Sequence, residues 1–195
     1  MGDDESHVKG NRILLGHQTP PAQFMNQVHG NSFAVIREKS EVDPTCDALI
    51  TTVPGLALAV MSADCIPLLL SSSRVVAAVH VGRKGLINRI SIEVIQAMRD
   101  LGALTIHAQL GPSICGSCYE VSQTLADEVL TSHPKAFSSS SAGNPALDLP
   151  KALIGDLVEL GVTYEASPIC TLENLDYFSY RRHKITGRNA GVIWL

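Results

Sequence analysis

The sequence lacks the features that mark membrane, secreted and nucleic-acid-binding proteins. No apolar run approaches the roughly 20 residues that a membrane-spanning helix needs. The net charge is −4, so there is no positive excess of the kind that binds nucleic acid or an anionic membrane. The opening residues, MGDDESHVKGNR, lack the apolar segment of a signal peptide. We therefore expect a cytoplasmic protein with no membrane or nucleic-acid partner.

Cysteine is also scarce, and its number is odd. The chain has 5 cysteines, which stay reduced in the cytosol, so disulfides are not expected. What is present is ordinary for a soluble globular protein: 195 residues with 45% hydrophobic and 17% charged side chains. This length suits one domain over residues 1–195 with a substantial core, and it leaves the oligomeric state open.

Short apolar runs bounded by turn residues predict strands, which dominate the first 81 residues. They lie at 33–39, 56–61, 66–71 and 74–81, and later ones lie at 104–110, 162–167 and 190–195.

Apolar residues at helical spacing predict three helices in the second half of the chain. The first has its apolar face from Ile87 to Leu101, the second from Val121 to Val129, and the third from Leu149 to Leu160. The polar stretch 137–146, FSSSSAGNPA, is expected to be a mobile loop. The pattern favours an α+β fold, a layered sandwich of helices on a mixed β-sheet.

An acid and a thiol interrupt two buried strands in the stretch MSADCIPLLL. Cys65 there, together with His29 and His80, is a plausible three-ligand set for a catalytic zinc with one open position. Asp64 is a candidate partner of a metal ligand or a proton carrier. Two alternatives use the same atoms. Cys65 can be a buried small hydrophobe, or it can pair with His80 as a metal-free nucleophile.

Two other segments are polar enough to carry chemistry. Cys115 and Cys118 form a C-x-x-C, but no second such pair completes four ligands. We expect this loop to pack near the site, with at most one thiol close to it. The segment 179–188 carries a basic cluster of arginines and a lysine. It is either a solvated turn or a clamp for phosphate or carboxylate.

Taken together in order, seven motifs resemble one known family. They are QVHG, DALIT, ADCIPLLL, AAVHVGRKGL, GPSICGSCYEV, CT followed by YFSYRR, and TGR. The resemblance, over nearly the whole chain, is to the laccase-domain purine nucleoside phosphorylases, formerly described as multicopper polyphenol oxidoreductases and also known as the peptidoglycan editing factor. It implies a layered α/β sandwich similar to that of the cytotoxic necrotizing factor toxins, which are cysteine hydrolases.

The resemblance also implies a metal and two reactions. His29, Cys65 and His80 match the family's zinc ligands, and copper is a possible alternative. The implied substrates are purine nucleosides and phosphate: phosphorolysis of adenosine, inosine and methylthioadenosine, and deamination of adenosine. Further catalytic candidates are Asp64 as an acid or base, and Lys84, Arg182 and Arg188 for phosphate. Candidate substrate-binding residues are Gln27, Arg83, Cys118 and Arg181.

The chain departs from the family pattern in three respects. Arg83 stands where the family has tryptophan, which removes a surface for stacking a purine, and Lys84 replaces an arginine. The family's N-terminal segment is expected to be missing. With 7 histidines and no H-x-H pair, a multicopper oxidase is poorly supported. A metal-free cysteine hydrolase or amidase acting on a cell-wall precursor, a copper polyphenol oxidoreductase and an inactive metal-binding protein remain as alternatives.

Overall fold

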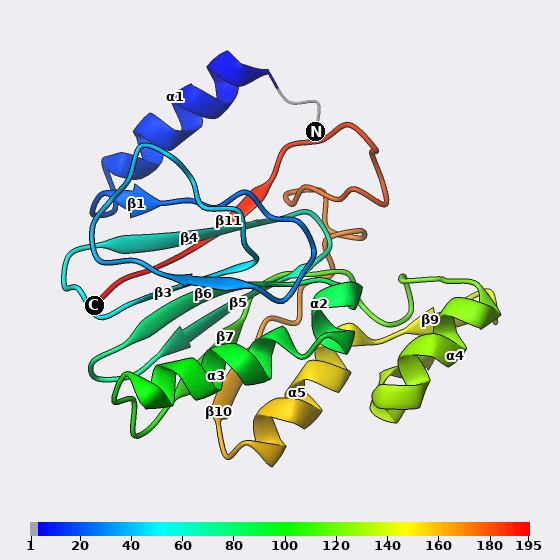
Figure 1. Ribbon diagram of the computed structural model, residues 1–195. Helices are drawn as coiled ribbons and strands as arrows, with labels where there is room; N and C mark the ends of the chain where they lie inside the picture. Colours follow the sequence, from blue (N-terminus) through cyan, green and yellow to red (C-terminus); the bar gives the residue numbers. More distant parts are fainter. Residues whose placement is uncertain (1–3) are drawn as a thin grey trace.

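A six-stranded mixed sheet runs through the middle of the computed structural model, which describes residues 4–195 except the side chain of Glu5 (Figure 1). Residues 1–3 of the predicted domain lie outside this description. The inner strands are antiparallel, and the two outermost pairs are parallel. In spatial order the strands are β10 (Thr163–Ala166), β7 (His107–Leu110), β5 (Ile66–Ser71), β6 (Val76–Val81), β3 (Ala48–Thr51) and β2 (Phe33–Val35).

Side chains alternate between the two faces of this sheet, as the two-residue period of a strand requires. In β6, Ala77, Val79 and Val81 belong to one buried cluster, and Val76 and Ala78 belong to another. The first cluster lies under helices, and the second lies under a smaller three-stranded sheet. That sheet contains β1 (Ala22–Gln23), β4 (Ala57–Ser62) and β11 (Asn189–Ile193). The side chain of His80 lies on the same face of the sheet as those of Val76 and Ala78.

Helices cover the face of the large sheet opposite the small sheet (Figure 1). They are α2 (Arg83–Ile87), α3 (Ile90–Asp100) and α5 (Leu149–Glu159). Helix α4 (Gln123–Ser132) packs beside α2 and β9 (Pro145–Leu147), next to a 3-10 turn, η1, at Pro134–Ala136. Of these, α3 buries Ile90, Val94, Ile95 and Met98 on one face. The predicted helix from Ile87 divides here because Arg89 adopts a φ of 60°, outside the right-handed helical region. The layered sheet-and-helix architecture is confirmed.

Helix α1 (Glu5–Gly16) and strand β3 are among the elements that were not predicted, and one stretch was predicted wrongly. Helix α1 has only a weak apolar face, with Ile13 and Leu14 exposed. Strand β3 is a fully buried run of only four residues. The stretch 137–146 is not an unstructured loop: β8 (Phe137–Ser139) pairs with β9 (Pro145–Leu147) as a hairpin. The predicted strand 33–39 is shorter, because β2 ends at Val35.

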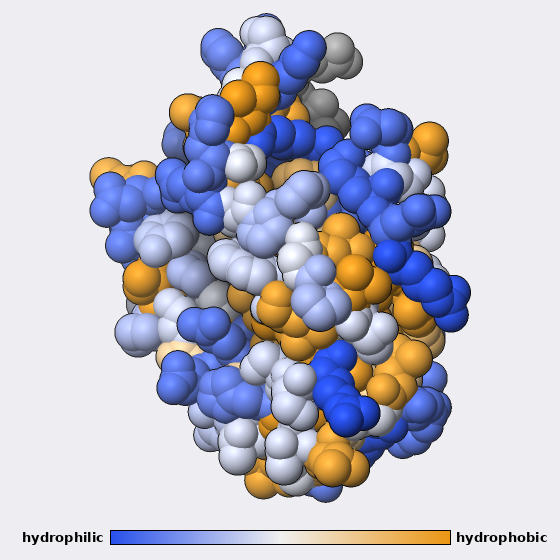
Figure 2. Space-filling model, turned by 90° about the vertical axis from the view of Figure 1, so that its left-hand side faces the viewer, coloured by the Kyte–Doolittle hydropathy of each residue, from blue (hydrophilic) through white to orange (hydrophobic). Residues whose placement is uncertain are grey.

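The surface has the mixed polar and apolar character that the amino-acid composition predicts. Hydrophilic and hydrophobic side chains are interspersed on the face shown in Figure 2. Among the described residues, no helix has both the length and the apolar character needed to cross a membrane.

Candidate metal centre and its surroundings

Three predicted ligands meet at the end of the large sheet beside α2. His29 lies in the loop after β1, Cys65 immediately precedes β5, and His80 is the second-last residue of β6. The antiparallel register pairs Ile66 with Val81, which brings Cys65 beside the end of β6. One ligand atom from each residue lies within 4.8 Å of the others, and Cys65 Sγ is 3.9 Å from His29 Nε2. The sequence-predicted triad is therefore assembled in space.

A buried carboxylate that sequence reasoning missed holds two of these ligands in place. Asp47 immediately precedes β3 and has no exposed surface. Its Oδ1 accepts hydrogen bonds from His80 Nδ1 at 2.8 Å and from the His29 N–H at 2.9 Å. Its Oδ2 accepts from the N–H groups of Val28 and Gly30 at 3.2 and 2.7 Å. With Nδ1 bound to Asp47, His80 presents Nε2 to the site, the arrangement usual for metal-ligating histidines.

The loop that carries His29 is bent sharply at the ligand itself. His29 has a φ of 60°, a left-handed conformation that is uncommon for any residue except glycine. The three consecutive N–H donations to Asp47 account for this bend. Gln27 fastens the preceding part of the loop, because its amide exchanges two hydrogen bonds with the backbone of Met61 at 2.7 and 2.9 Å. Its proposed contact with substrate stays a prediction, while its side-chain amide secures the metal-ligand loop.

The space next to the triad is available only because residue 82 is glycine. A Cβ on Gly82 would lie 3.0 Å from Cys65 Sγ and 3.2 Å from His29 Cδ2. The φ of Gly82 is −89°, so the backbone itself does not require glycine. The donors fit zinc by their chemistry, since two imidazoles and a thiolate leave a fourth position open. Gly82 preserves the room that such an ion and its fourth ligand need.

We expect Gly82→Ala to weaken metal binding at this centre by at least about 10-fold, because the methyl group displaces the thiolate or the imidazole. Gly10→Ala is the matched control, since a Cβ there meets nothing within 4 Å. Zinc affinity is measured by competition with a chromophoric chelator. Equal affinities in the two variants would contradict the assignment of Gly82 to the metal cradle.

Without metal, the triad is a thiolate beside an imidazolium. Burial raises the pKa of Cys65, but hydrogen bonds and charge from His29 and His80 outweigh it and lower the pKa to about 7. Burial lowers the pKa of His80, but the hydrogen bonds with Asp47 and Cys65 outweigh it and raise the pKa to about 9. A large fraction of Cys65 is therefore in the thiolate form that binds metal near neutral pH.

We expect metal-free protein to show a Cys65 alkylation rate that rises with pH around a midpoint near 7. This midpoint lies below that of an ordinary cysteine because the lowered pKa keeps the reactive thiolate present at more acidic pH. Alkylation at a series of pH values, with the site identified by peptide mass, measures it. A midpoint near 9.0, the ordinary value, would contradict the thiolate–imidazolium description.

Asp64 ties together three loops around the centre. Its Oδ1 accepts a hydrogen bond from Thr171 Oγ1 at 2.8 Å, and its Oδ2 accepts one from the Arg181 N–H at 2.7 Å. Its backbone carbonyl accepts from the Ile114 N–H at 3.0 Å. Asp64 also has a φ of 94°, a strained conformation of the kind found at functional sites. These contacts favour a positioning role for Asp64, and its role as an acid or base stays a prediction.

The arginines of the predicted basic cluster have different partners. The Arg182 guanidinium donates to the carbonyls of Thr171, Leu172, Asn174 and Tyr177. These contacts hold the C-terminal loop and favour a positioning role over phosphate binding.

The other basic residues are engaged to different degrees. Arg188 donates to the neighbouring carbonyls of Thr186 and Gly187, and Lys184 lies 4.7 Å from the Tyr180 ring. Lys84 is exposed in the first turn of α2, two residues after Gly82. Their predicted roles toward phosphate remain predictions, and Lys84 is the one nearest in sequence to Gly82.

Two arginines flank an aromatic ring that sequence reasoning did not single out. Arg181 lies over the ring of Tyr119 at 5.1 Å and donates to the Glu120 carbonyl at 3.0 Å. Burial raises the pKa of Tyr119, against the charge of Arg83, and the nearby Cys65 thiolate raises it further. Arg83 also lies 3.6 Å from Glu128.

The cysteine loop lies near the centre, as predicted, since the N–H of Ile114 donates to the carbonyl of Asp64. Cys115 and Cys118 are joined by Cys170 and Glu173, and one ligand atom of each lies within 4.8 Å of the rest. No second C-x-x-C is involved, but Cys170 and Glu173, from a distant loop, supply two further candidate ligands that the sequence did not indicate. Cys118 Sγ is 3.3 Å from Glu173 Oε1, so its predicted contact with substrate competes with this pairing.

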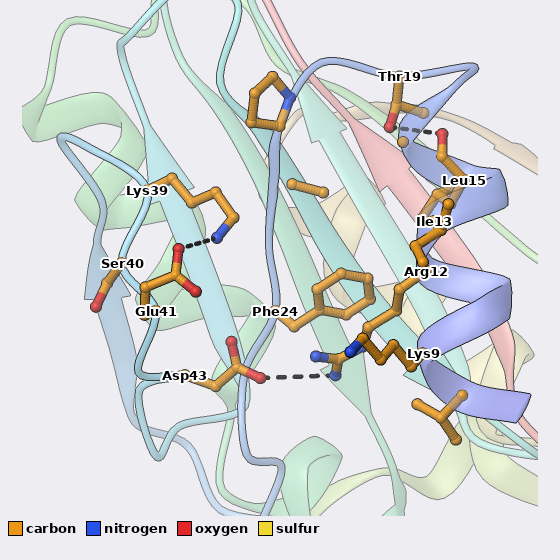
Figure 3. Close-up of a pocket in the computed structure, with 14 residues that line it drawn as sticks. Lys9, Arg12, Ile13, Leu15, Thr19, Phe24, Lys39, Ser40, Glu41 and Asp43 are labelled. Carbon is orange, nitrogen blue, oxygen red and sulfur yellow. Dashed lines mark hydrogen bonds and ion pairs between the residues drawn. The ribbon is translucent and has the colours of Figure 1, made fainter. Parts of the chain in front are cut away.

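A cavity of about 570 Å³ lies away from this centre, between α1 and the loop at 39–43 (Figure 3). Four of its charged side chains form two ion pairs. Arg12 lies 3.6 Å from Asp43 and covers the Phe24 ring at 4.0 Å, and Lys39 bonds Glu41 at 3.2 Å. None of the predicted site residues lines it. The cavity is therefore separate from the predicted centre of His29, Cys65 and His80.

Comparison with known proteins gives matches over the full chain. Residues 1–195 match the family described as multi-copper polyphenol oxidoreductase laccase. The chain is 43% identical to the purine nucleoside phosphorylase of Streptomyces coelicolor, over all of this chain and 85% of that protein. It is 40% identical to the purine nucleoside phosphorylase of Corynebacterium glutamicum, over all of this chain and 84% of that protein.

Solved structures share the fold. A Neisseria meningitidis protein superposes with a TM-score of 0.90 at 33% identity, over all of this chain and 83% of that one. YlmD from Geobacillus stearothermophilus superposes with a TM-score of 0.87 at 26% identity, over 99% of this chain and 82% of that one.

Proposed function

Because the chain belongs to the multi-copper polyphenol oxidoreductase laccase family, and its full length is similar to proteins named purine nucleoside phosphorylase, we propose that it is a metal-dependent purine nucleoside phosphorylase. The observation that carries the proposal is the assembled centre of His29, Cys65 and His80, oriented by Asp47. In phosphorolysis, a phosphate oxygen bonds to the anomeric carbon as the bond to the base breaks. The base leaves with the electron pair and gains a proton.

Zinc is the metal we propose for this centre. His29, Cys65 and His80 would hold it, and when bound it supplies a Lewis acid beside the reacting nucleoside. Copper binds the same donor types with higher intrinsic affinity, so metal content must be measured on protein that has not been exposed to added copper. Among the described residues, the two groups of possible ligands contain only two histidines, both in this centre. This donor inventory favours a single Lewis-acid ion there over a multicopper oxidase centre.

The side chains around Tyr119 are the ones we propose for the substrates. Arg83 and Arg181 flank this ring, and Lys84 is exposed two residues beyond the glycine that lines the centre. Cations placed here would bind phosphate and offset its charge during attack. The Tyr119 ring can carry the flat purine in place of the tryptophan that Arg83 replaces. Asp64 holds the loop of Arg181 in position through the Arg181 N–H.

The proposed substrates are adenosine, inosine and methylthioadenosine, and deamination of adenosine is the second proposed activity. The test is an assay of zinc-loaded protein on adenosine with and without phosphate, with adenine and inosine resolved as separate products. We expect adenine only with phosphate, and inosine from the deamination. Release of neither product would overturn the proposed function.

Substitution of Arg181 in the same assay tests whether this residue binds phosphate. We expect Arg181→Gln to raise KM for phosphate at least about 10-fold, by removal of a charged hydrogen-bond donor. Arg74→Gln is the control, because Arg74 is exposed in the turn before β6, at the other end of that strand from His80. An unchanged KM for phosphate in Arg181→Gln would remove this residue from the proposed site.

A metal-free cysteine hydrolase is the second candidate, favoured by one observation. The lowered pKa of Cys65 beside two imidazoles is the arrangement of an activated thiol nucleophile. The two candidates differ in what metal does. Zinc bound by Cys65 blocks its alkylation and supports phosphorolysis, whereas a hydrolase would be inhibited by zinc and inactivated by alkylation of the metal-free protein.

A further inference from the structure

A second group of ligating side chains lies at the junction of two loops that are far apart in the sequence. We call Cys115, Cys118, Cys170 and Glu173 the thiolate cluster. Their ligand atoms all lie within 4.8 Å of one another. Tetrahedral zinc with bonds of about 2.3 Å to sulfur places its ligand atoms about 3.8 Å apart. The cluster therefore needs only small side-chain shifts to close around an ion.

The backbone of the first loop is shaped as a turn that points two thiols the same way. The N–H groups of Cys118 and Tyr119 both donate to the Cys115 carbonyl at 3.1 Å. Gly116 lets this turn pack closely against Asp148, because a Cβ there would lie 2.7 Å from Asp148 Cβ. Ser117 Oγ lies 3.2 Å from Cys115 Sγ and can donate to it as a thiolate. A C-x-x-C in such a turn is half of a common zinc site.

The second loop brings the other two ligands and is itself firmly held. Ser113 and Cys170 form a parallel bridge, and the Cys115 N–H donates to Cys170 Sγ at 3.4 Å. A backbone donor to sulfur stabilises a thiolate. Cys170 is buried at 6% exposure, whereas Glu173 is exposed. Arg182 binds four carbonyls of this loop, which brings a positive charge to the segment that carries Cys170 and Glu173.

We propose that the thiolate cluster is a second, structural zinc site. Three thiolates and one carboxylate complete a four-coordinate shell from protein alone, so no position remains open for chemistry. Soft sulfur donors select zinc over magnesium or calcium. A disulfide accounts for the group less well, because pairing any two of three thiols leaves the third, and Glu173, without a role.

This ion also steadies the first centre, through Asp64. Ile114 and Thr171 are the direct sequence neighbours of Cys115 and Cys170, and both donate to Asp64, at 3.0 and 2.8 Å. An ion that joins the two loops therefore fixes both donors. Asp64 in turn immediately precedes Cys65 and accepts the Arg181 N–H. The thiolate cluster is thus placed to position Cys65 and Arg181 without contacting substrate.

The test is a count of zinc ions per chain by native mass spectrometry of protein purified without added metal. We expect two ions in the wild type, one in Cys65→Ala, one in Cys118→Ser and none in the double variant. Cys46→Ser is the matched control and should keep two, because Cys46 lies in the core with its Sγ against the Ala48 carbonyl. The count requires no activity, so an inactive protein with two ions would overturn only the proposed function.

A single zinc that disappears entirely in Cys65→Ala would overturn the second site, as would a mass lower by two hydrogens in freshly purified wild type. Misfolding of a cysteine variant would also remove zinc, so Glu173→Gln provides a second test. Glu173 is exposed, and its substitution should leave the fold intact. We expect this variant to keep the wild-type circular dichroism and to lose at least about 10-fold in affinity at the second site. Cobalt-loaded Cys65→Ala should keep an intense thiolate-to-cobalt absorption band, and its absence would also overturn the proposal.

Discussion

Cys65→Ala is expected to abolish zinc binding at the His29 and His80 centre and to lower kcat/KM for phosphorolysis by more than about 100-fold. Loss of a residue that merely orients a ligand costs about 10- to 100-fold, and Cys65 is itself one of the three proposed ligands. The two remaining imidazoles do not supply the charge that the thiolate contributes to the ion. Metal content and steady-state kinetics on inosine with phosphate measure both effects.

Cys46→Ser is again the control for the loss of a thiol elsewhere in the chain, because serine can keep the hydrogen bond to the Ala48 carbonyl. A Cys65→Ala protein with a wild-type circular dichroism spectrum and undiminished kcat/KM would contradict the prediction. Phosphorolysis at the wild-type rate in that variant would also exclude Cys65 as a nucleophile. The same experiment therefore tests both proposed roles of Cys65, as a metal ligand and as a nucleophile.

Asp47→Asn is expected to lower the free energy of unfolding by about 3–5 kcal/mol and the zinc affinity by about 10- to 100-fold. Each carboxylate oxygen of Asp47 accepts two hydrogen bonds, one pair from His29 and His80 and the other from Val28 and Gly30. An amide has a single acceptor oxygen, so its NH₂ group must face one of these pairs of donors. Chemical denaturation and chelator competition measure the two losses.

The same variant should move the pH dependence of Cys65. Burial raises the pKa of Asp47, but its hydrogen bonds to His80, Gly30 and His29 outweigh this and lower it, so the carboxylate is charged at neutral pH. Without that charge the pKa of His80 falls from about 9, and less imidazolium remains to stabilise the thiolate. The alkylation midpoint of Cys65 should then rise above 7.

A purely structural loss in Asp47→Asn would lower stability without moving that midpoint, and this result would contradict the positioning role. Asp127→Asn is the control, since Asp127 is exposed on α4 and bonds Gln123. It should change neither the zinc affinity nor the alkylation midpoint.

The triad was predictable from sequence, whereas its supports were not. Cys65 stood out because a thiol next to an acid interrupts two apolar strands, and His29 and His80 lie one and two residues before glycines in equally polar segments. Asp47 does not stand out from the sequence around it in this way. Its role depends on the register that pairs Ala48 with Val79, which places Asp47 beside His80, and register is a tertiary property.

The thiolate cluster was missed for a related reason. A sequence search for zinc ligands expects two close pairs, and Cys170 with Glu173 is not a C-x-x-C. The bridge between Ser113 and Cys170 brings the loops together, and nothing local in either loop indicates it. Helix α1 and the hairpin of β8 and β9 were missed because their apolar residues are few, so periodicity gave no signal.

The central claim is that a metal held by His29, Cys65 and His80 is required for phosphorolysis. The most direct test measures phosphate-dependent release of hypoxanthine from inosine while zinc is withdrawn by a chelator and then restored, with zinc content determined in the same samples. We predict that activity falls as this centre empties, returns when zinc is restored, and never appears in Cys65→Ala. Full activity in metal-free protein would contradict the account.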